Sequence, residues 1–331
     1  MTGFRDIPAD HFSRAHRLIA EHLRPSPLIE LDRVSSLAGH RILVKAECLQ
    51  PTGSFKIRGA MHVVGSLSEI QRHQGVIAYS TGNHAQAVAM AARRFATRAV
   101  IVMSPDAPTP KIDATHELGA EILMAAPTSA ARRALAELTA KERGLKLIPP
   151  YDDLEVIAGQ GTIALELMQQ IADAAAVFVP IGGGGLISGV AAALKQLKPS
   201  ITIIGVEPDL ENDALQSLHA GKRIALPGPS RSICDAIKVQ MLGDLTFPLI
   251  RHYVDDIVSV TEEQIIRAMG IALTSGRLWL EPAGAVALAA ALSFEGPAKT
   301  ALPLIAIGSG GNIALDRASR LAEDRELTGK I

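Results

Sequence analysis

Short apolar runs alternate with helical patterns along most of this chain. Residues 75–80 (GVIAYS) form an apolar run, residues 84–96 (HAQAVAMAARRFA) repeat small apolar side chains at helical spacing, and residues 99–105 (AVIVMSP) are apolar again. A second series begins at residues 175–181 (AAVFVPI) and ends at residues 302–311 (LPLIAIGSGG). Strands that alternate with helices are typical of βαβ units. The pattern therefore predicts an α/β fold with two open, twisted, mostly parallel sheets flanked by helices.

The length of the chain favours two packed domains. Its 331 residues exceed the size of one average domain, and the sequence contains neither an internal repeat nor a charged linker. We expect a small domain over residues 76–147 and a large domain built from residues 1–75 and 148–331.

One uncharged stretch, Ala174–Leu194, is long enough to cross a bilayer. Its centre contains Pro180 and then four consecutive glycines, which would break a spanning helix and leave backbone groups unpaired in lipid. We therefore interpret the stretch as a buried strand, a glycine loop and a helix, and expect no membrane association.

Charge and cysteine content narrow the possible partners. Lys and Arg number 33 against 34 for Asp and Glu, so no strong field gathers nucleic acid or an anionic membrane. The expected partner is a small molecule.

Cys48 and Cys234 are the only two cysteines and lie far apart, which argues against a disulfide scaffold or a thiolate zinc site. Charges throughout residues 1–20 exclude a secretory core, so the sequence predicts a cytoplasmic protein.

The first segment with candidate chemistry is residues 51–64 (PTGSFKIRGAMHVV). The Pro-Thr-Gly sequence predicts a turn and a helix that starts near Ser54, which places Lys56 in the first helical turn. A cation there opposes the helix dipole and lies beside Phe55, and both conditions favour a neutral amine suited to imine formation. An ordinary surface lysine is the alternative interpretation.

A second segment, residues 80–92 (STGNHAQAVAMAA), follows an apolar run and leads into an alanine-rich helix. Backbone amides and short polar side chains at such a turn can hold an anion. The residues expected to bind a substrate carboxylate are Ser80, Thr81, Gly82, Asn83 and His84. Helix capping by Ser, Thr and Asn is the competing interpretation.

A third segment, residues 179–189 (VPIGGGGLISG), predicts a strand, a loop and a helix. Consecutive glycines allow backbone N–H groups to approach a phosphate, and the helix N-terminus adds a favourable potential. A Gly-x-Gly-x-x-Gly dinucleotide motif does not fit any placement here, so a simple phosphate monoester is favoured over NAD.

A fourth segment, residues 305–312 (IAIGSGGN), ends a buried strand in a glycine turn that presents Ser309. Ligands collect at the carboxyl ends of parallel strands, although a simple capped turn remains an alternative.

Together with IAGQGT and EPAGA, these segments resemble fold-type II pyridoxal 5'-phosphate (PLP) enzymes, which have the tryptophan synthase β-like fold. The likeness covers nearly the whole chain and is greatest to the serine/threonine dehydratase and serine racemase family. The resemblance implies that the large domain binds PLP and that Lys56 holds it as an imine. It assigns the remaining cofactor contacts to Phe55, Asn83, Gly182, Gly183, Gly184, Gly185, Leu186, Glu281 and Ser309.

The resemblance also gives these residues separate roles. Phe55 lies along the ring, Asn83 bonds the ring hydroxyl, and the glycine loop with Leu186 offers amides to the phosphate. Ser309 faces the pyridine nitrogen, where a neutral hydroxyl weakens the electron sink and favours elimination over transamination. Glu281 lies near the ring in relatives, although it could instead serve only as an N-terminal acid of the following helix.

Two positions decide between elimination and racemisation. Thr81 occupies the place where serine racemases have a catalytic serine, so a hydroxyl is retained with an added methyl. Tyr151 stands where racemases have asparagine and is similar to the aromatic residue of threonine dehydratases. Ala236 in CDAIK replaces a glycine of the family pattern and leaves the substrate size open.

Three acidic residues at or just after the end of the run 202–208 form a candidate metal site. Glu207, Glu211 and Asp213 match positions that bind Mg²⁺ or Ca²⁺ in racemase-like members, and hard oxygen ligands suit both ions. A solvated acidic loop is the alternative.

The resemblance predicts a PLP-dependent lyase that converts L-threonine, L-serine or another 3-hydroxy amino acid to a 2-oxo acid and ammonia. A serine racemase and a 3-hydroxyaspartate dehydratase on the same scaffold are alternatives, and a non-catalytic amino-acid sensor is a third. Lys56 and Thr81 are the expected catalytic residues, and a homodimer is expected by resemblance alone.

Overall fold

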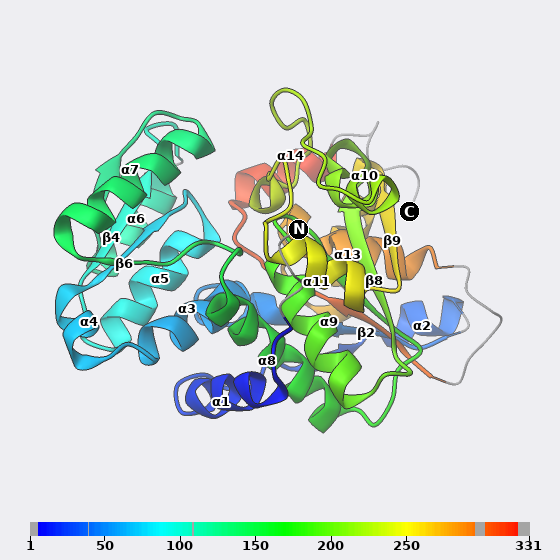
Figure 1. The fold of residues 1–331 in the computed structure, drawn as a ribbon. Coiled ribbons are helices and arrows are strands. Elements are labelled where there is room, and N and C mark those ends of the chain that lie inside the picture. The colour runs from blue at the N-terminus through cyan, green and yellow to red at the C-terminus, as the bar shows by residue number, and fades with distance from the viewer. Residues whose placement is uncertain (1–5, 39, 108, 295–301, 324–331) are drawn as a thin grey trace.

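Two lobes of unequal size lie side by side in the computed structural model, which describes residues 6–38, 40–107, 109–294 and 302–323 (Figure 1). Each lobe is built around one sheet. All strand pairs are parallel except one at an edge of the larger sheet. The expected α/β fold with two mostly parallel sheets is therefore confirmed.

The larger sheet has six strands, and its first strand runs antiparallel to the second. In spatial order the strands are β1 (Leu28–Glu30), β2 (Ile42–Lys45), β10 (Leu304–Ile307), β7 (Ala176–Pro180), β8 (Thr202–Pro208) and β9 (Asp256–Val260).

The smaller sheet has four parallel strands. Their order is β5 (Glu121–Met124), β4 (Ala99–Met103), β3 (Val76–Tyr79) and β6 (Lys146–Leu147). All four strands lie within residues 76–147, the range predicted for the small domain. The exact limits of the two domains stay a prediction.

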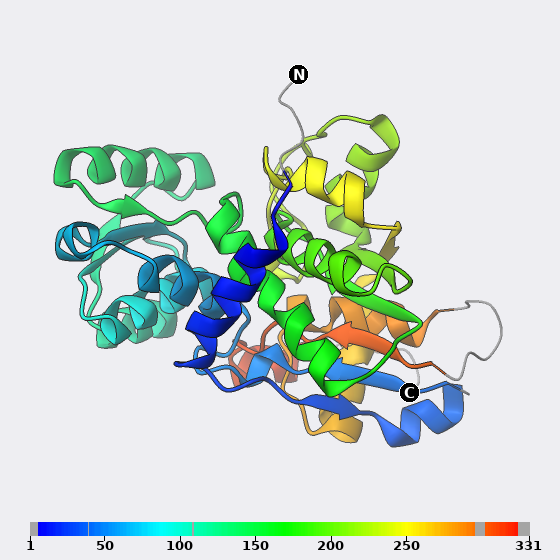
Figure 2. The same ribbon diagram turned by 60° about the horizontal axis from the view of Figure 1, so that its bottom comes forward.

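Both faces of the larger sheet are buried, because the strands alternate their side chains between two apolar clusters. Val177 and Val179 of β7 face the first cluster, whereas Phe178 faces the second. Helices on the first side are α1 (Ala9–Ala20), α8 (Leu154–Gln170), α9 (Gly185–Leu197), α10 (Asp213–Ala220) and α11 (Thr246–Tyr253). Helices on the second side, seen with the sheet edge forward in Figure 2, are α2 (Asp32–Ala38), α12 (Glu262–Gly276) and α13 (Pro282–Leu292).

The smaller sheet is likewise covered on both faces. Helices α3 (Lys56–Gly65) and α5 (Asn83–Arg94) share one apolar cluster with β3 and β4, and α7 (Ser129–Arg143) packs on the other face. The remaining helical segments are α4 (Glu69–Gln74), α6 (Thr109–Glu117), α14 (Leu315–Glu323), and the short turns η1 (Glu47–Leu49), η2 (Asp209–Glu211) and η3 (Asp235–Ile237).

The uncharged stretch 174–194 forms β7, a glycine turn and the first part of α9, as predicted. Within the part of the chain that the structure describes, no helix combines the length and hydrophobicity needed to cross a bilayer.

A buried ionic cluster fixes α3 between the lobes. The guanidinium of Arg58 donates to both oxygens of Glu47 at 2.7 and 2.8 Å and to both oxygens of Glu166 at 2.6 and 2.8 Å. Lys45 also donates to Glu166, at 2.6 Å. Burial raises the pKa of Glu166, but Arg58 and Lys45 more than offset this effect and hold the pKa below its ordinary value. Because Arg58 follows Lys56 by two positions, this cluster holds the first turn of α3, which contains Lys56.

Candidate active site

A cavity of about 470 Å³ lies where loops from both sheets meet. Its walls include residues that follow β3, β7 and β10, at the carboxyl ends of parallel strands. The cavity brings together every predicted catalytic, cofactor-binding and substrate-binding residue, which are Phe55, Lys56, Ser80, Thr81, Gly82, Asn83, His84, Gly182, Gly183, Gly184, Gly185, Leu186, Glu281 and Ser309. What each of them does there is still a prediction.

Lys56 is the first residue of α3, so the helix begins two residues later than the predicted start at Ser54. Ser54 is held in a bridge with Gly310, and the Phe55 amide donates to the carbonyl of Ser309 at 3.0 Å. These extended contacts delay the helix and bring the GSGGN turn beside the lysine.

The Lys56 amine is held in a form close to neutral. Burial lowers the pKa of Lys56 to about 8. Its Nζ donates to the carbonyl of Pro150 at 2.5 Å and lies 5.1 Å from the centre of the Phe55 ring. Near pH 8 about half of such amines are unprotonated, which is the form that attacks a carbonyl.

The STGNH loop precedes α5, which begins at Asn83. Among the residues that the structure describes, the backbone amides of Thr81, Asn83 and His84 donate no hydrogen bond. Gly82 instead donates to the Ser80 hydroxyl at 3.2 Å. Free amides at a helix N-terminus form an anion-binding turn, so the geometry favours anion binding over simple capping.

Asn83 and His84 carry two further polar groups of the cavity wall. The Asn83 amide nitrogen donates to Glu281 at 2.6 Å, and its oxygen accepts from Asn312 at 2.8 Å, which leaves one N–H available. His84 Nε2 lies 2.9 Å from the carbonyl oxygen of Ile148, so this nitrogen carries the hydrogen. Burial, together with the charge of Lys56, lowers the pKa of His84 to about 3 and keeps the ring neutral.

The glycine loop between β7 and α9 is suited to a phosphate. Within the described chain, none of the five amides of residues 182–186 donates a hydrogen bond. Gly184 has a φ of 91°, which favours glycine. A methyl group at Gly183 would lie 2.4 Å from two ring atoms of Tyr151, and one at Gly185 would lie 2.8 Å from its Cβ. Side chains are therefore excluded from the loop.

Glu281 and Ser309 complete the inner wall. Burial raises the pKa of Glu281 to about 7. Glu281 immediately precedes α13, but its side chain makes no capping hydrogen bond to that helix. The carboxylate instead accepts a hydrogen bond from Asn83. The Ser309 hydroxyl donates to the carbonyl of Ala283 at 3.3 Å.

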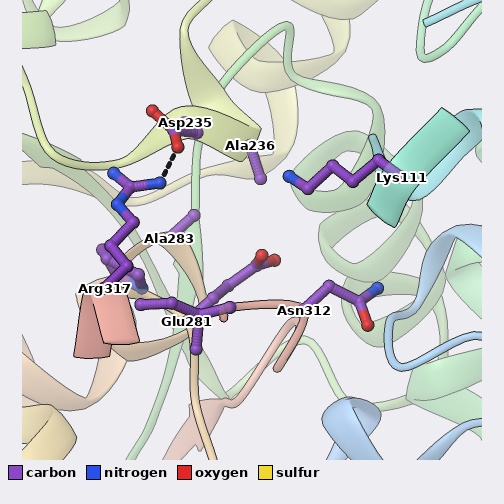
Figure 3. A pocket seen from close by; sticks show the side chains of 9 residues that line it. Lys111, Asp235, Ala236, Glu281, Ala283, Asn312 and Arg317 are labelled. Carbon is purple, nitrogen blue, oxygen red and sulfur yellow. Dashed lines mark hydrogen bonds and ion pairs between the residues drawn. The ribbon is translucent and has the colours of Figure 1, made fainter. Parts of the chain in front are cut away.

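A smaller chamber of about 10 Å³ adjoins the cavity behind Glu281 (Figure 3). Its polar lining includes Lys111, Asp235, Asn312 and Arg317, and Arg317 pairs with Asp235. Lys111 comes from α6 of the smaller lobe, whereas the other residues belong to the larger lobe.

Sequence reasoning did not identify several residues of the cavity wall. They are Tyr79, Lys111, Ser129, Ala130, Arg132, Arg133 and Val239, whereas Asp235 and Lys238 belong to the CDAIK segment that was expected to bear on substrate size. Most of them lie on helices or loops whose local patterns are ordinary, and only the packing of the two lobes brings them to the site. Asn312 is the last residue of the GSGGN segment. Its position after a buried strand was the one feature of the sequence that could have indicated a place in the site.

The predicted metal ligands lie apart from this cavity. Both carboxylate oxygens of Glu207 accept backbone amides of α10, from Ala214 at 3.0 Å and Leu215 at 2.9 Å. Glu211 accepts the amide of Arg231 at 3.0 Å. Asp213 is buried, and its Oδ2 has no partner. In the ranges that the structure describes, no three His, Cys, Asp or Glu residues are arranged to hold a metal ion.

Known proteins are similar to this chain over most of its length. The sequence pattern of the family described as "Pyridoxal-phosphate dependent enzyme" matches residues 19–303. The chain is 43% identical to serine racemase of Arabidopsis thaliana over 279 residues, which cover 84% of each protein. It is 38% identical to L-threo-3-hydroxyaspartate ammonia-lyase of Saccharomyces cerevisiae over 312 residues, which cover 94% of this chain and 95% of that protein.

A known structure is similar over nearly the whole chain. The processed form of threonine deaminase isoform 2 from Solanum lycopersicum superposes with a TM-score of 0.90 and 36% identity, covering 99% of this chain and 96% of that chain. The resemblance inferred from the six sequence segments is confirmed, and the chain belongs to the pyridoxal-phosphate dependent enzyme family.

Proposed function

We propose that this enzyme eliminates water from a 3-hydroxy amino acid of the L-serine or L-threonine type, and that hydrolysis of the unsaturated amine so formed gives a 2-oxo acid and ammonia. One observation carries the proposal. A single cavity holds a lysine amine with a pKa of about 8, a glycine loop with unpaired amides, and an anion-binding turn. Relatives named as ammonia-lyases and deaminases support this class of reaction.

The residues of the cavity are compatible with PLP. The five free amides of residues 182–186 suit its phosphate, and the tight contacts of Gly183 and Gly185 keep that loop open to the ligand. Lys56 supplies the amine that bonds the aldehyde carbon. The unused N–H of Asn83 can donate to the ring hydroxyl, and Ser309 lies in the same wall.

When bound, PLP supplies an electron-accepting ring that stabilises negative charge at the substrate Cα. With PLP bound, the Nζ of Lys56 would be the base that takes the Cα proton, and the Pro150 carbonyl can accept a hydrogen bond from the resulting ammonium. The free amides of Thr81, Asn83 and His84 hold the substrate carboxylate. Ser309 offers a neutral hydroxyl instead of a carboxylate, which moderates the electron sink and favours loss of the β-hydroxyl.

Ammonia and 2-oxo acid release from L-serine and L-threonine test this proposal. We expect turnover by the PLP-loaded enzyme and none by Lys56→Ala. An equal release of ammonia by the wild type and by Lys56→Ala, or none from any 3-hydroxy amino acid, would remove the proposal.

Racemisation is a second candidate, because the Thr81 hydroxyl lies in the cavity wall and a relative is named serine racemase. If Thr81 protonates the second face of Cα, Thr81→Ser should keep or increase D-serine formation and Thr81→Ala should abolish it. Elimination should survive in both variants. D-serine formation that is unchanged in Thr81→Ala would exclude this role.

We also propose a Mg²⁺ or Ca²⁺ site at Glu207, Glu211 and Asp213; the described structure does not hold these three carboxylates in a metal-binding arrangement, so binding requires them to move. The unpartnered Oδ2 of buried Asp213 supports it, as does burial that raises the pKa of Asp213 to about 7 and of Glu207 to about 8. A cation would stabilise the charged forms of these carboxyls. The melting temperature should rise with Mg²⁺ or Ca²⁺ and fall with EDTA, and no change in either direction would refute the site.

A homodimer and a cytoplasmic location are proposals that rest on the resemblance and on the charge pattern. Sedimentation equilibrium of the PLP-loaded enzyme should give twice the 34.9 kDa chain mass, and fractionation of the source cells should recover it with soluble proteins.

A further inference from the structure

Lys111 is a cation of the cavity to which neither the sequence analysis nor the proposed chemistry gives a role. It lies in the first turn of α6, on the smaller lobe, and lines both the main cavity and the small chamber. Figure 3 shows its side chain extending toward Glu281 and Ala236 of the larger lobe. Lys111 therefore lies where the two lobes face each other across the site.

The amine of Lys111 lies directly beside the anion-binding turn. A methyl group at Gly82 would be 3.7 Å from Lys111 Nζ and would meet no other atom within 4 Å. The neighbouring amides of Thr81, Asn83 and His84 donate to no group in the described structure. The Lys111 amine and three free N–H groups thus lie around one open space at Gly82.

The charges around Lys111 leave it without an ion pair. Asp235 pairs with Lys238 at 2.7 Å and with Arg317, and Glu281 accepts the Asn83 amide at 2.6 Å. Among the described residues, no carboxylate lies within 4.0 Å of Lys111 Nζ. Burial raises the pKa of Glu281, and the charge of Lys111 offsets part of this rise. No described carboxylate forms an ion pair with Lys111 Nζ, however, so this half-buried cation among unpaired donors is still able to bind an external anion.

A second group in the same wall also lacks a partner. His84 is 3% exposed, and its Nε2 donates to the Ile148 carbonyl, so Nδ1 is an acceptor without a hydrogen. This Nδ1 is buried and bonds to nothing in the described structure. His84 therefore keeps one buried ring nitrogen that no described group uses, beside the free donors of the anion-binding turn.

We propose that Lys111 binds a carboxylate of the substrate, with Nζ donating to an oxygen held at Gly82. This inference rests on the proposed function, because it takes the substrate to be an amino acid. Two carboxylates have the required chemistry. One is the α-carboxylate that every amino acid carries, and the other is a side-chain carboxylate such as that of L-threo-3-hydroxyaspartate. In either case, the residue joins the smaller lobe to the bound substrate.

The test compares Lys111→Met, which removes the charge at similar length, with Lys111→Arg, which keeps it. Lys141→Met is the matched control, because Lys141 lies in the last turn of exposed α7 on the same lobe and outside the cavity. KM and kcat are measured on the PLP-loaded enzymes with L-serine and with L-threo-3-hydroxyaspartate. Calorimetry with propanoate and butanedioate measures carboxylate binding without turnover.

Lys111→Met should raise KM by about 10- to 100-fold, the range for a lost hydrogen bond between charged groups, with a smaller change in kcat. An equal rise for both substrates and weaker binding of both probes identify the α-carboxylate. A rise for L-threo-3-hydroxyaspartate alone, with weaker binding of butanedioate alone, identifies the side-chain carboxylate. Lys111→Arg should stay closer to the wild type than Lys111→Met.

The inference is overturned if KM and the dissociation constants of the two probes stay within about twofold of the wild type in Lys111→Met. It is also overturned if Lys141→Met changes these constants as much as Lys111→Met does. A wild-type enzyme that turns over no 3-hydroxy amino acid contradicts the proposed function instead. In that case the binding of propanoate and butanedioate, measured by calorimetry, tests the inference about Lys111. If neither carboxylate binds the wild-type protein, the result counts against the inference.

Discussion

Replacing Gly183 by alanine tests whether the glycine loop must lie against Tyr151 to hold the cofactor phosphate. The added methyl would approach two atoms of the Tyr151 ring to 2.4 Å. Carbon atoms in favourable contact are about 3.5–4.0 Å apart, so the loop or the ring must move by about 1 Å. The Gly183 carbonyl accepts from the Thr246 hydroxyl, and Asp152 beside Tyr151 accepts the Leu245 amide, so the loop and the tyrosine are both held and share the displacement.

The expected magnitude follows from the cost of overpacking. Inserting a methyl into a well-packed site costs about 1–3 kcal/mol. If the loop relieves this overpacking by moving away from the position that binds phosphate, cofactor binding must return it there at the same cost. The dissociation constant for PLP then rises by about 5- to 160-fold.

Titration of the cofactor-free protein with PLP, followed by absorbance, measures this effect. Gly270→Ala is the matched control, because a methyl there meets no atom within 4 Å, and it should leave the dissociation constant unchanged. In a Tyr151→Ala background the obstacle is gone, so Gly183→Ala should change the dissociation constant by less than about threefold. A Gly183→Ala protein that binds PLP within twofold of the wild type would refute the reasoning.

Two further predictions concern Lys56 and its support. Arg58→Met leaves Glu47 and Glu166 facing Lys45 alone, so it should lower the free energy of unfolding by about 3–5 kcal/mol at pH 7 in urea titrations. Arg58 helps to keep the pKa of Glu166 low, and the stability this provides is present above the ordinary carboxyl pKa and lost as pH falls through the folded value. The loss in Arg58→Met should therefore be about equal at pH 7 and pH 5, which both lie above the ordinary carboxyl pKa of 4.5, and should shrink as the pH falls below 4.5; a loss that stays constant below that value would contradict this account. In the cofactor-free protein, the rate at which PLP attaches to Lys56 should rise with pH up to about 8 and then level off, whereas a rise that continues to pH 10 would contradict the lowered pKa.

The parts of the fold that follow local rules could be predicted from the sequence. Apolar runs with flanking glycines identified β3, β7 and β10, and the residues after each strand formed one cavity because parallel strands direct their carboxyl ends to the same edge. The start of α3 was wrong by two residues, since Ser54 is held by Gly310, a residue more than 250 positions away.

Residues brought to the site by lobe packing could not be predicted. Lys111 and Arg132 lie on helices of ordinary pattern, and their place in the cavity depends on how the smaller lobe meets the larger. The ionic cluster of Arg58, Glu47 and Glu166 was missed for the same reason, because charged residues are expected at the surface unless their partners are known.

The covalent link at Lys56 is the central claim, and one measurement tests it most directly. Freshly purified enzyme is reduced with borohydride, digested, and analysed by peptide mass spectrometry. The account predicts a pyridoxyl phosphate mass on the peptide that contains Lys56 and on no other lysine peptide. An unmodified Lys56 peptide from PLP-loaded enzyme, or the added mass at another lysine, would contradict it.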